Sequence, residues 1–254
     1  MWEEFKSLLG TFKKSGVQEA VNFELMNEIL ISHHSTAIEG SSLTHEETLL
    51  LLTDGITAKG KPLQDHDMVR DHQQALVETV RLARQKTKVD IQLIQKISAL
   101  VMRTTGSVIS AAAGNYDSSK GDFRKSMVHV GTRYFSNYEK VPREVEKLCS
   151  WIDAKLKDIT SEEDIYNLAF DAHFYLVTIH PFADGNGRVS RLLMNYILAY
   201  HSQPLAVLFV EDKLDYYQAL EDARQSDPPA IEVFRNFMYK QQIKYLTQEL
   251  KKVS

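Results

Sequence analysis

The chain has 254 residues, and 43% of them are hydrophobic, which is enough for one sizeable core or for one core plus a small helical lobe. Acidic residues (34) outnumber basic ones (30), and the formal net charge of -4 argues against a dedicated nucleic-acid binder. One cysteine, Cys149, excludes an internal disulfide and a cysteine-based zinc framework. Because neither a secretory leader nor a membrane-length apolar run is present, we expect a cytoplasmic protein without membrane or nucleic-acid partners.

Apolar residues recur at steps of three and four, and glycine and proline are sparse, which predicts a mostly helical protein. The second predicted helix is closed by Thr53-Asp54-Gly55, and Pro142 opens the fifth. In chain order the predicted helices cover residues 22–31, 47–52, 68–82, 89–102, 142–156, 162–179, 188–199, 216–223 and 233–250.

One β-prone stretch interrupts the helical pattern. Residues 127–130 read as a strand, Gly131 can turn the chain, and residues 133–135 read as a second strand. We therefore expect a short hairpin inserted in a helical protein. The preceding stretch, residues 111–120, is rich in small and polar residues and is predicted to be a mobile loop.

The stretch with the most chemistry runs over residues 180–191, with the sequence His-Pro-Phe-Ala-Asp-Gly-Asn-Gly-Arg-Val-Ser-Arg. Pro181 disfavours helix at the residue before it, so His180 should stand at a helix-to-loop corner with its ring facing a cleft, as a general base requires. Asp184 is a short carboxylate beside a predicted phosphate cradle, the usual arrangement for holding Mg²⁺ together with phosphate oxygens.

The glycine-rich part of this stretch predicts an anion site. Residues 185–187 expose backbone N–H groups at the start of a helix, where the helix dipole favours an anion. Arg188 and Arg191 share a face of the first turn, where cations oppose that dipole unless an anion is bound. An isolated Asp-Gly-Asn-Gly is usually only a turn. The joint occurrence with a histidine and two arginines indicates nucleotide phosphate transfer instead.

The whole stretch resembles the defining motif of the Fic family, His-Pro-Phe-x-Asp/Glu-Gly-Asn-Gly-Arg-x-x-Arg, and matches it at every fixed position. The resemblance extends over residues 20–240. It implies an all-α, Fic-like helical domain with a short β-hairpin flap, which transfers AMP from ATP to a hydroxyl of a target protein. The implied organisation is an N-terminal helical region (1–60), a Fic domain (61–240) and a C-terminal helical tail (241–254).

The resemblance also implies a role for each motif residue. His180 would be the general base, and Asp184 would hold Mg²⁺ between the α- and β-phosphates. The backbone of Gly185 to Gly187, with Asn186, would cradle the phosphates, and Arg188 and Arg191 would bind the β- and γ-phosphates. Related Doc-type kinases carry lysine at the position of Gly187 and bind the nucleotide in reverse. Gly187 therefore favours AMP over phosphate as the transferred group.

A second stretch, Ser35-Thr36-Ala37-Ile38-Glu39-Gly40, resembles the family's inhibitory motif, Ser/Thr-x-x-x-Glu-Gly/Asn. The resemblance implies that Glu39 pairs with Arg191 in place of the γ-phosphate, because an Arg–carboxylate pair mimics an Arg–phosphate pair. Glu39-Gly40 taken alone also fits a plain helix end with a capping glycine. Ser41 stands where the family usually has asparagine.

Other implied contacts lie outside the two motifs. The hairpin corresponds to the family's flap, along which a target protein with an exposed hydroxyl would dock by strand pairing; an ordinary hairpin packed on the core is the alternative. Asn195 would face the nucleotide or cap an internal carbonyl. The resemblance places at the nucleotide Val128, His129, Val130 and Gly131 of the flap, together with Tyr216 and Tyr217.

Two rival functions follow from the same residues. In the first, the protein is a de-AMPylase in which Glu39 positions water. In the second, it is a non-catalytic interaction module that senses nucleotide, although pure binding would need no base at His180. The resemblance also implies homodimerisation, which is common in the family.

Overall fold

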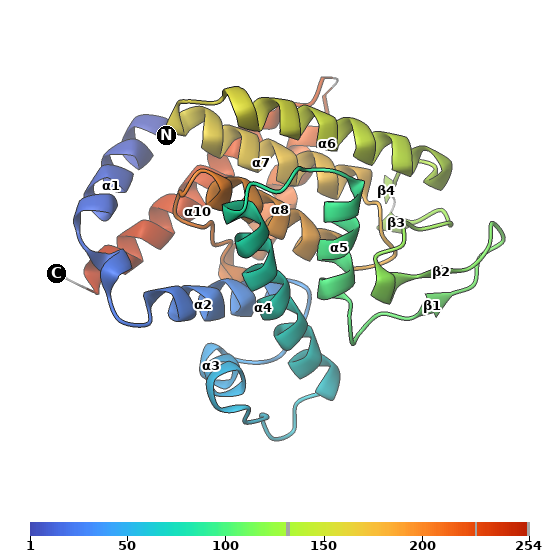
Figure 1. Cartoon of the computed structure of the whole chain (residues 1–254), viewed down its shortest axis with the longest axis horizontal. Helices are drawn as coiled ribbons and strands as arrows, with labels where there is room; N and C mark the ends of the chain where they lie inside the picture. Colours follow the sequence, from blue (N-terminus) through green and yellow to red (C-terminus); the bar gives the residue numbers. More distant parts are fainter. Residues whose placement is uncertain (131–132, 227, 253–254) are drawn as a thin grey trace. The chain divides into compact units, whose positions relative to one another are not determined.

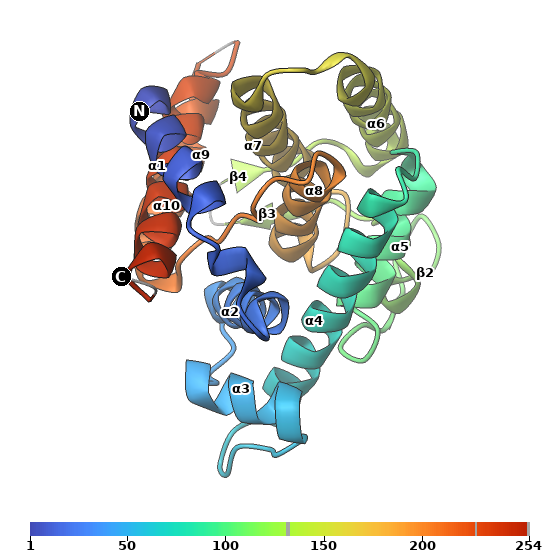
Figure 2. The same cartoon turned by 60° about the vertical axis from the view of Figure 1, so that its left-hand side comes forward.

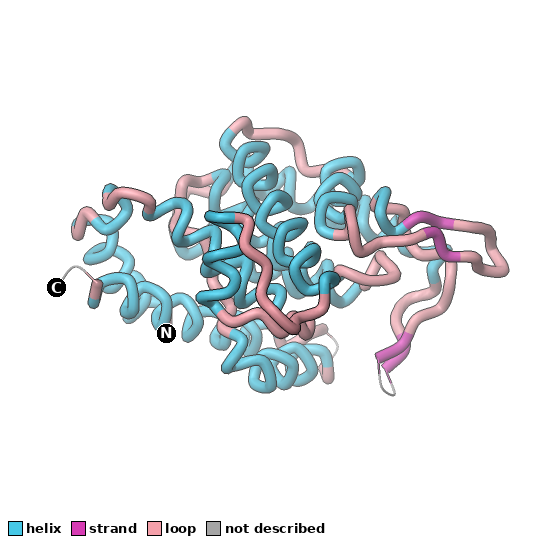
Figure 3. Tube along the Cα trace, turned by 90° about the horizontal axis from the view of Figure 1, so that it is seen from below, coloured by secondary structure: helices cyan, strands magenta, loops and turns pink. Residues whose placement is uncertain are grey.

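The structure, a computed structural model, describes residues 1–130, 133–226 and 228–252. Helices make up most of this part of the chain, and its strands are confined to two antiparallel hairpins (Figure 3). The predicted helical fold with a short β-hairpin is confirmed. No helix in the described ranges is both long enough and apolar enough to cross a membrane.

The residues form two compact units, Met1–Ala58 with Leu205–Ser254, and Lys59–Pro204. The change of unit after Ala58 falls close to the predicted boundary at residue 60. Residues 205–240 belong to the same unit as the N-terminus. The division into three functional regions stays a prediction.

The first unit consists of α1 (Trp2–Lys14), α2 (Phe23–Ile38), α3 (His45–Asp54), α9 (Lys213–Arg224) and α10 (Ile231–Lys251), with 3₁₀ turns at Val17–Glu19 and Val210–Asp212. Helix α1 lies along α10, as Figure 2 shows, and α9 also packs on α10. Helix α1 lies outside the predicted helices. Its buried residues Phe5, Leu9 and Phe12 follow helical spacing, and the ring of Phe5 packs 5.4 Å from that of Tyr239.

The second unit contains α4 (Leu63–Arg84), α5 (Ile91–Val101), α6 (Val141–Asp158), α7 (Glu162–Ile179) and α8 (Asn186–Tyr200) (Figure 1). Helix α8 packs against α7, α4 and α5, and its side chains are buried continuously from Arg188 to Ala199. A helix that is buried on every side belongs inside a core. The motif of residues 180–191 therefore sits where the best-packed helix of the unit begins.

Both hairpins belong to the second unit. The strands β3 (His129–Val130) and β4 (Arg133–Tyr134) form the predicted flap, followed by a 3₁₀ turn at Tyr138–Lys140. The prediction of a loop over 111–120 is wrong in its second half. Strand β2 (Tyr116–Asp117) pairs there with β1 (Val108–Ile109), and a 3₁₀ turn follows at Ser118–Lys120.

The helix boundaries follow capping groups that the apolar pattern does not contain. The predicted helix 47–52 begins earlier, at His45, because Thr44 and Glu47 form a reciprocal capping box. The prediction for 162–179 is confirmed at both ends, since Ser161 caps the N-terminus of α7 and His180 terminates it.

Three histidines in the first unit lie close together. The ring centroid of His33 lies 4.9 Å from that of His34 and 5.5 Å from that of His45. Burial, and next the charges of His33 and His45, lower the pKa of His34 to about 3. Its Nδ1 accepts the Val210 N–H at 3.3 Å, which requires an unprotonated nitrogen. The Glu211 carboxylate 3.8 Å away is therefore not an ion-pair partner near neutral pH.

We predict an acid-sensitive stability that originates at His34. Its folded pKa lies below the ordinary value of 6.5, so the unfolded chain binds more protons and stability falls as pH drops from 6.5 towards 3. Between pH 7 and pH 5 this one group should cost about 2 kcal/mol. Urea unfolding at several pH values gives the free energy of unfolding as a function of pH. Its slope between pH 7 and pH 5 should be smaller for His34→Gln than for wild type. A His129→Gln control on the exposed flap should keep the wild-type slope, and an unchanged slope in His34→Gln would refute the assignment.

Candidate functional site

The corner between α7 and α8 is built around His180. Helix α7 ends at Ile179, as Pro181 predicts, and the His180 N–H still donates to the Leu176 carbonyl at 3.0 Å. His180 itself is left-handed, with φ 55° and ψ 59°. This conformation costs a residue other than glycine about 1–2 kcal/mol, so contacts around the corner must hold it.

Two residues that precede or follow the flap strands make those contacts. Arg124 donates from Nε to the His180 carbonyl at 2.8 Å and from its backbone N–H to the Pro181 carbonyl at 3.0 Å. The Phe135 ring stacks on the imidazole of His180, with centroids 4.0 Å apart and planes at 18°. The predicted base thus touches the end of the predicted flap. The motif analysis identified neither residue, since neither has a fixed spacing to residues 180–191.

The loop after the corner is closed by Asn186. Its Oδ1 accepts the Phe182 N–H at 2.9 Å, and its Nδ2 donates to the Phe182 carbonyl at 3.0 Å. The Phe182 side chain is buried and anchors the loop. We expected the Asn186 amide to help cradle phosphate. In the structure the Asn186 side chain fixes the loop, and its contact with phosphate stays a prediction.

The N-terminus of α8 is open. Gly185 precedes the first helical residue with φ 80°, and no side chain caps the helix there. The first N–H groups of a helix have no partner within the helix, and the glycine at the N-cap position has no side chain to supply one. This is the arrangement in which a helix N-terminus binds an anion. A Cβ added to Gly185 would lie 3.0 Å from the Met102 sulfur, so the position is restricted by space as well as by conformation.

Arg188 is buried beneath this N-terminus, with only 1% of its surface exposed. Its Nη2 lies 3.3 Å from Asp184 Oδ2 and 3.5 Å from the Met102 sulfur. Its Nε and Nη1 are buried and have no hydrogen-bond partner among the residues that the structure describes. Buried donors of a charged group are costly to leave unsatisfied, and a phosphate would supply oxygens in a matching geometry.

Arg191 is also buried, with 3% of its surface exposed. His72 of α4 is fully buried, and its pKa is held well below the usual range by burial and then by the charges of Arg191 and Arg188. His72 is therefore neutral, and the positive charge of this region comes from the two guanidinium groups.

Asp184 differs from the arginines because 68% of its side chain is exposed. Its Oδ1 accepts the Gly185 N–H at 2.6 Å, which turns the carboxylate towards the start of α8. No group of three or more histidine, cysteine, aspartate or glutamate side chains in the described part of the chain could hold a metal ion. A metal at Asp184 would therefore take its remaining ligands from a bound substrate or from water.

The flap residues predicted to line the nucleotide lie on β3 or beside it. Val128 is half-buried, and its carbonyl accepts the Phe135 N–H at 3.2 Å. His129 is exposed, and its ring lies 5.5 Å from that of Tyr134. Val130 pairs with Arg133, and Gly131 lies outside the described residues. The hairpin geometry is as predicted, and the nucleotide contacts stay a prediction.

The predicted inhibitory residues lie at the C-terminal end of α2 in the first unit. Ser35 is buried, and Glu39 is an exposed residue at the C-cap position. Gly40 is left-handed at φ 106°, and the N–H groups of Gly40 and Ser41 bond to the carbonyls of Ala37 and Thr36 at 3.1 Å each. This is a complete Schellman motif, so Gly40 caps the end of α2. The pairing of Glu39 with Arg191 stays a prediction.

The remaining predicted residues have different environments. Tyr216 is buried in the first unit, with its ring 6.3 Å from Phe234 and 6.1 Å from Phe237, which is the setting of a core residue. Tyr217, beside it in α9, is 43% exposed. Asn195 is buried in α8. The nucleotide contacts of all three residues stay predictions.

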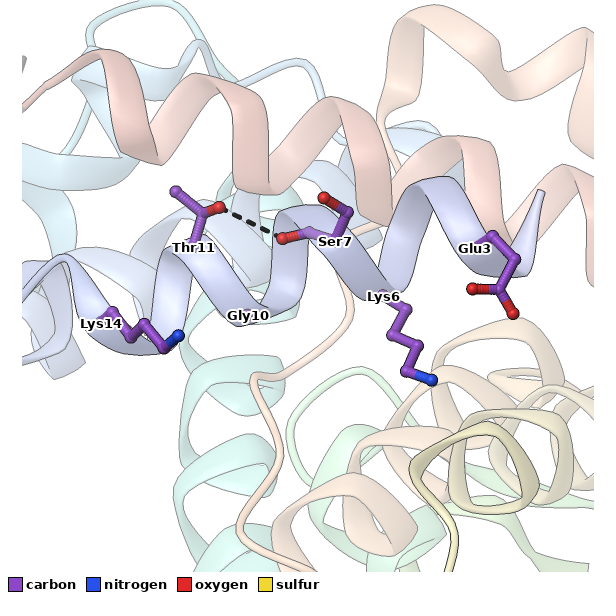
Figure 4. Close-up of a pocket in the computed structure, with 6 residues that line it drawn as sticks. All are labelled: Glu3, Lys6, Ser7, Gly10, Thr11 and Lys14. Atoms are coloured by element: carbon purple, nitrogen blue, oxygen red, sulfur yellow. Dashed lines mark hydrogen bonds between the residues drawn. The ribbon is translucent and has the colours of Figure 1, made fainter.

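A shallow groove runs along the exposed face of α1 (Figure 4), lined by Glu3, Lys6, Ser7, Gly10, Thr11 and Lys14. Thr11 donates its hydroxyl to the Ser7 carbonyl at 3.1 Å, an ordinary bond within a helix. The residues that line the groove include no histidine and no buried charged side chain. The chemistry of a site is therefore found at the corner between α7 and α8.

The fold and this corner define a helical domain with an anion cradle between two core helices and a hairpin beside it. The family model described as the Fic/DOC family matches residues 88–198, and the chain belongs to this family.

Similar proteins include the protein adenylyltransferase fic-1 of Caenorhabditis elegans, 30% identical over 201 residues. That match covers 78% of this chain and 37% of the relative, so the chain spans well under half of that protein. The protein adenylyltransferase Fic of Nematostella vectensis is 29% identical over 196 residues, which cover 77% of this chain and 43% of the relative. A Fic domain containing signaling protein from Bacteroides thetaiotaomicron has the same fold, with a TM-score of 0.81 at 23% identity; the match covers 98% of this chain and 97% of that one.

We predict that Gly185→Ala destabilises the corner, because alanine would have to adopt φ 80° with its Cβ against Met102. The free energy of unfolding should fall by about 1–3 kcal/mol, measured by urea denaturation. Gly10→Ala is the matched control, since Gly10 lies within α1 and its added Cβ would meet nothing within 4 Å. That control should be neutral or stabilising. Equal effects of the two variants would contradict the prediction.

Proposed function

We propose that the protein transfers AMP from ATP to a serine, threonine or tyrosine hydroxyl of a target protein. One observation carries the proposal. At the uncapped start of α8, buried Arg188 has two donors with no partner among the described residues, and His180 stands at the preceding corner. Curated relatives named as protein adenylyltransferases support the same reaction.

In this proposal each part of the corner has one task. The open N–H groups of α8 and the Arg188 guanidinium hold the phosphates and neutralise charge, which is most of what such a transfer requires. An imidazole nitrogen of His180 takes the proton of the target hydroxyl. The hydroxyl oxygen forms a bond to the α-phosphorus, the bond from that phosphorus to the β-bridging oxygen breaks, and pyrophosphate leaves.

The exposed carboxylate of Asp184 fits a Mg²⁺ ion that is shared with substrate phosphates. It lies at the start of α8, and Mg²⁺ is commonly bound through one or two carboxylates together with phosphate oxygens and water. When bound there, Mg²⁺ would offset phosphate charge. Asp184 would orient the ion while Arg188, 3.3 Å from its Oδ2, approaches the phosphates from the buried side.

The target protein would dock along the flap. Strands β3 and β4 pair only with each other in the described part of the chain, so the hairpin has outer edges to which an extended segment can add. Tyr134 on β4 is 71% exposed and offers an apolar surface at that edge. Strand addition aligns a hydroxyl without demanding much of its neighbouring sequence.

We further propose that Glu39 restrains this activity by competing with the γ-phosphate for Arg191. A carboxylate and a phosphate present similar oxygens to a guanidinium, so only one of them can occupy it. The Schellman motif supports the proposal because it fixes the backbone of Glu39 at the end of α2 while its side chain stays exposed.

We predict that Glu39→Gly raises self-modification by labelled ATP at least several-fold over wild type, because the γ-phosphate then has Arg191 to itself. Label on the protein, located by mass spectrometry as AMP on a hydroxyl residue, is the measurement. Adding His180→Ala to this variant should abolish the signal. Transfer that persists without His180 would refute the base assignment. A Glu39→Gly protein that is folded yet no more active would refute the inhibition. Removal of AMP by wild type, lost on Glu39→Gly, would indicate the reverse enzyme.

A second prediction concerns binding alone. Arg188→Gln should weaken ATP binding about 10- to 100-fold, because bonds to a charged partner contribute about 1.5–3 kcal/mol. The protein without nucleotide should be no less stable, since two unpartnered buried donors of a charged group are removed. Isothermal titration and thermal melting with and without ATP measure both quantities. Arg143→Gln, on the exposed face of α6, is the control and should bind ATP like wild type. Unchanged affinity in Arg188→Gln would contradict the phosphate role.

A further inference from the structure

Arg124 connects the flap to the corner that carries His180. The residue is buried, with 1% of its surface exposed, and each nitrogen of its guanidinium donates to a different backbone carbonyl. Nε donates to His180 at 2.8 Å, Nη1 to Ser126 at 2.9 Å, and Nη2 to Ser136 at 2.6 Å. Ser126 precedes the flap strands and Ser136 follows them. One side chain therefore holds both ends of the flap and the backbone of the predicted base.

The chemistry of this contact suits arginine and no other residue. A guanidinium is planar and presents its donors in a fixed fork, whereas a lysine ammonium is a point charge on a flexible stem. Burial lowers the pKa of Arg124, which the nearby Glu144 partly opposes, yet arginine stays protonated in proteins. Its charge also lies at the C-terminal end of α7, where the helix dipole favours a cation.

The flap also reaches the imidazole directly. Phe135 is the residue before Ser136, and its ring stacks on that of His180 at 4.0 Å. A second bond holds Ser136, whose hydroxyl donates to Glu144 Oε1 at 3.2 Å. Because Arg124 fixes the Ser136 carbonyl and the His180 carbonyl to one rigid group, it sets where the Phe135 ring meets the imidazole.

We propose that Arg124 is a positioning residue for the transfer reaction, acting through His180 and the flap. This inference rests on the proposed function, in which the target hydroxyl docks on the flap and His180 takes its proton. Arg124 touches no reacting atom. It keeps the surface that carries the hydroxyl in register with the group that deprotonates it.

The first test needs no activity. Amide hydrogen exchange should be faster in Arg124→Gln for peptides within 126–130, 133–137 and 178–182. Exchange within α8 should be unchanged. Lys125→Gln is the matched control. Its exposed ammonium donates to the Asn115 carbonyl of the other hairpin at 2.8 Å, so its removal should leave those peptides as in wild type. Exchange in Arg124→Gln that equals wild type would overturn the coupling.

The second test measures transfer in the Glu39→Gly background. Arg124→Gln should lower kcat by about 10- to 100-fold, as a displacement of about 1 Å does at an active site. The KM for ATP should stay within about 2-fold, because the cradle at α8 is untouched; distortion of that cradle would raise KM as well. Arg124→Lys keeps the positive charge without the planar fork of donors, so its kcat should lie between those of the protein with Arg124 and of Arg124→Gln. If Arg124→Gln does not fold, Arg124→Lys carries both tests. An unchanged kcat alongside faster exchange would overturn the positioning role.

The two proposals fail in different ways. If the Glu39→Gly protein with Arg124 intact binds ATP but transfers nothing, the proposed function fails, and the transfer role of Arg124 fails with it. If that protein transfers AMP and Arg124→Gln transfers it equally well, only the positioning role fails.

Discussion

The left-handed turn at His180 is the constraint on which the rest of the site depends. Helix α7 ends at this turn, and Pro181 follows it. The loop that comes next is closed by Asn186, and α8 then begins without a capping side chain. A residue other than glycine adopts this conformation at a cost and needs outside support. The support comes from Arg124 and Phe135, both adjacent to the flap strands. The strained turn, the anion cradle and the flap are thus one connected arrangement.

Three buried arginines serve this arrangement with different partners. Arg124 donates to three backbone carbonyls and is satisfied within the fold. Arg188 keeps two donors without a partner in the described residues, and Arg191 lies beside neutral His72. Burying a cation costs desolvation free energy, which hydrogen-bond acceptors within the fold offset; where acceptors are lacking, a bound anion would offset it. The satisfied hydrogen-bond donors of Arg124 therefore indicate a structural role, whereas the unsatisfied donors of Arg188 indicate the proposed binding site.

Much of the fold could be predicted because its signals are local. The apolar period gave most of the helices, and Pro181 gave the end of α7. The errors also have local causes. Helix α1 was overlooked although Phe5, Leu9 and Phe12 have helical spacing. Strand β2 was taken for loop because its pairing partner lies several residues away and its stretch is polar.

The sequence by itself indicated the type of chemistry that we propose, because the order of residues 180–191 places a histidine, a carboxylate, open N–H groups and two arginines along one turn and one helix start. Only the tertiary structure decided how each side chain is used. Asn186 bonds to its own loop and Tyr216 packs in an aromatic core, which the motif and the resemblance did not predict, and the ligand contacts suggested for both stay predictions. Arg124 became visible only through its partners at residues 126, 136 and 180. Local preference acts between near neighbours in the chain, whereas these partners are brought together by packing.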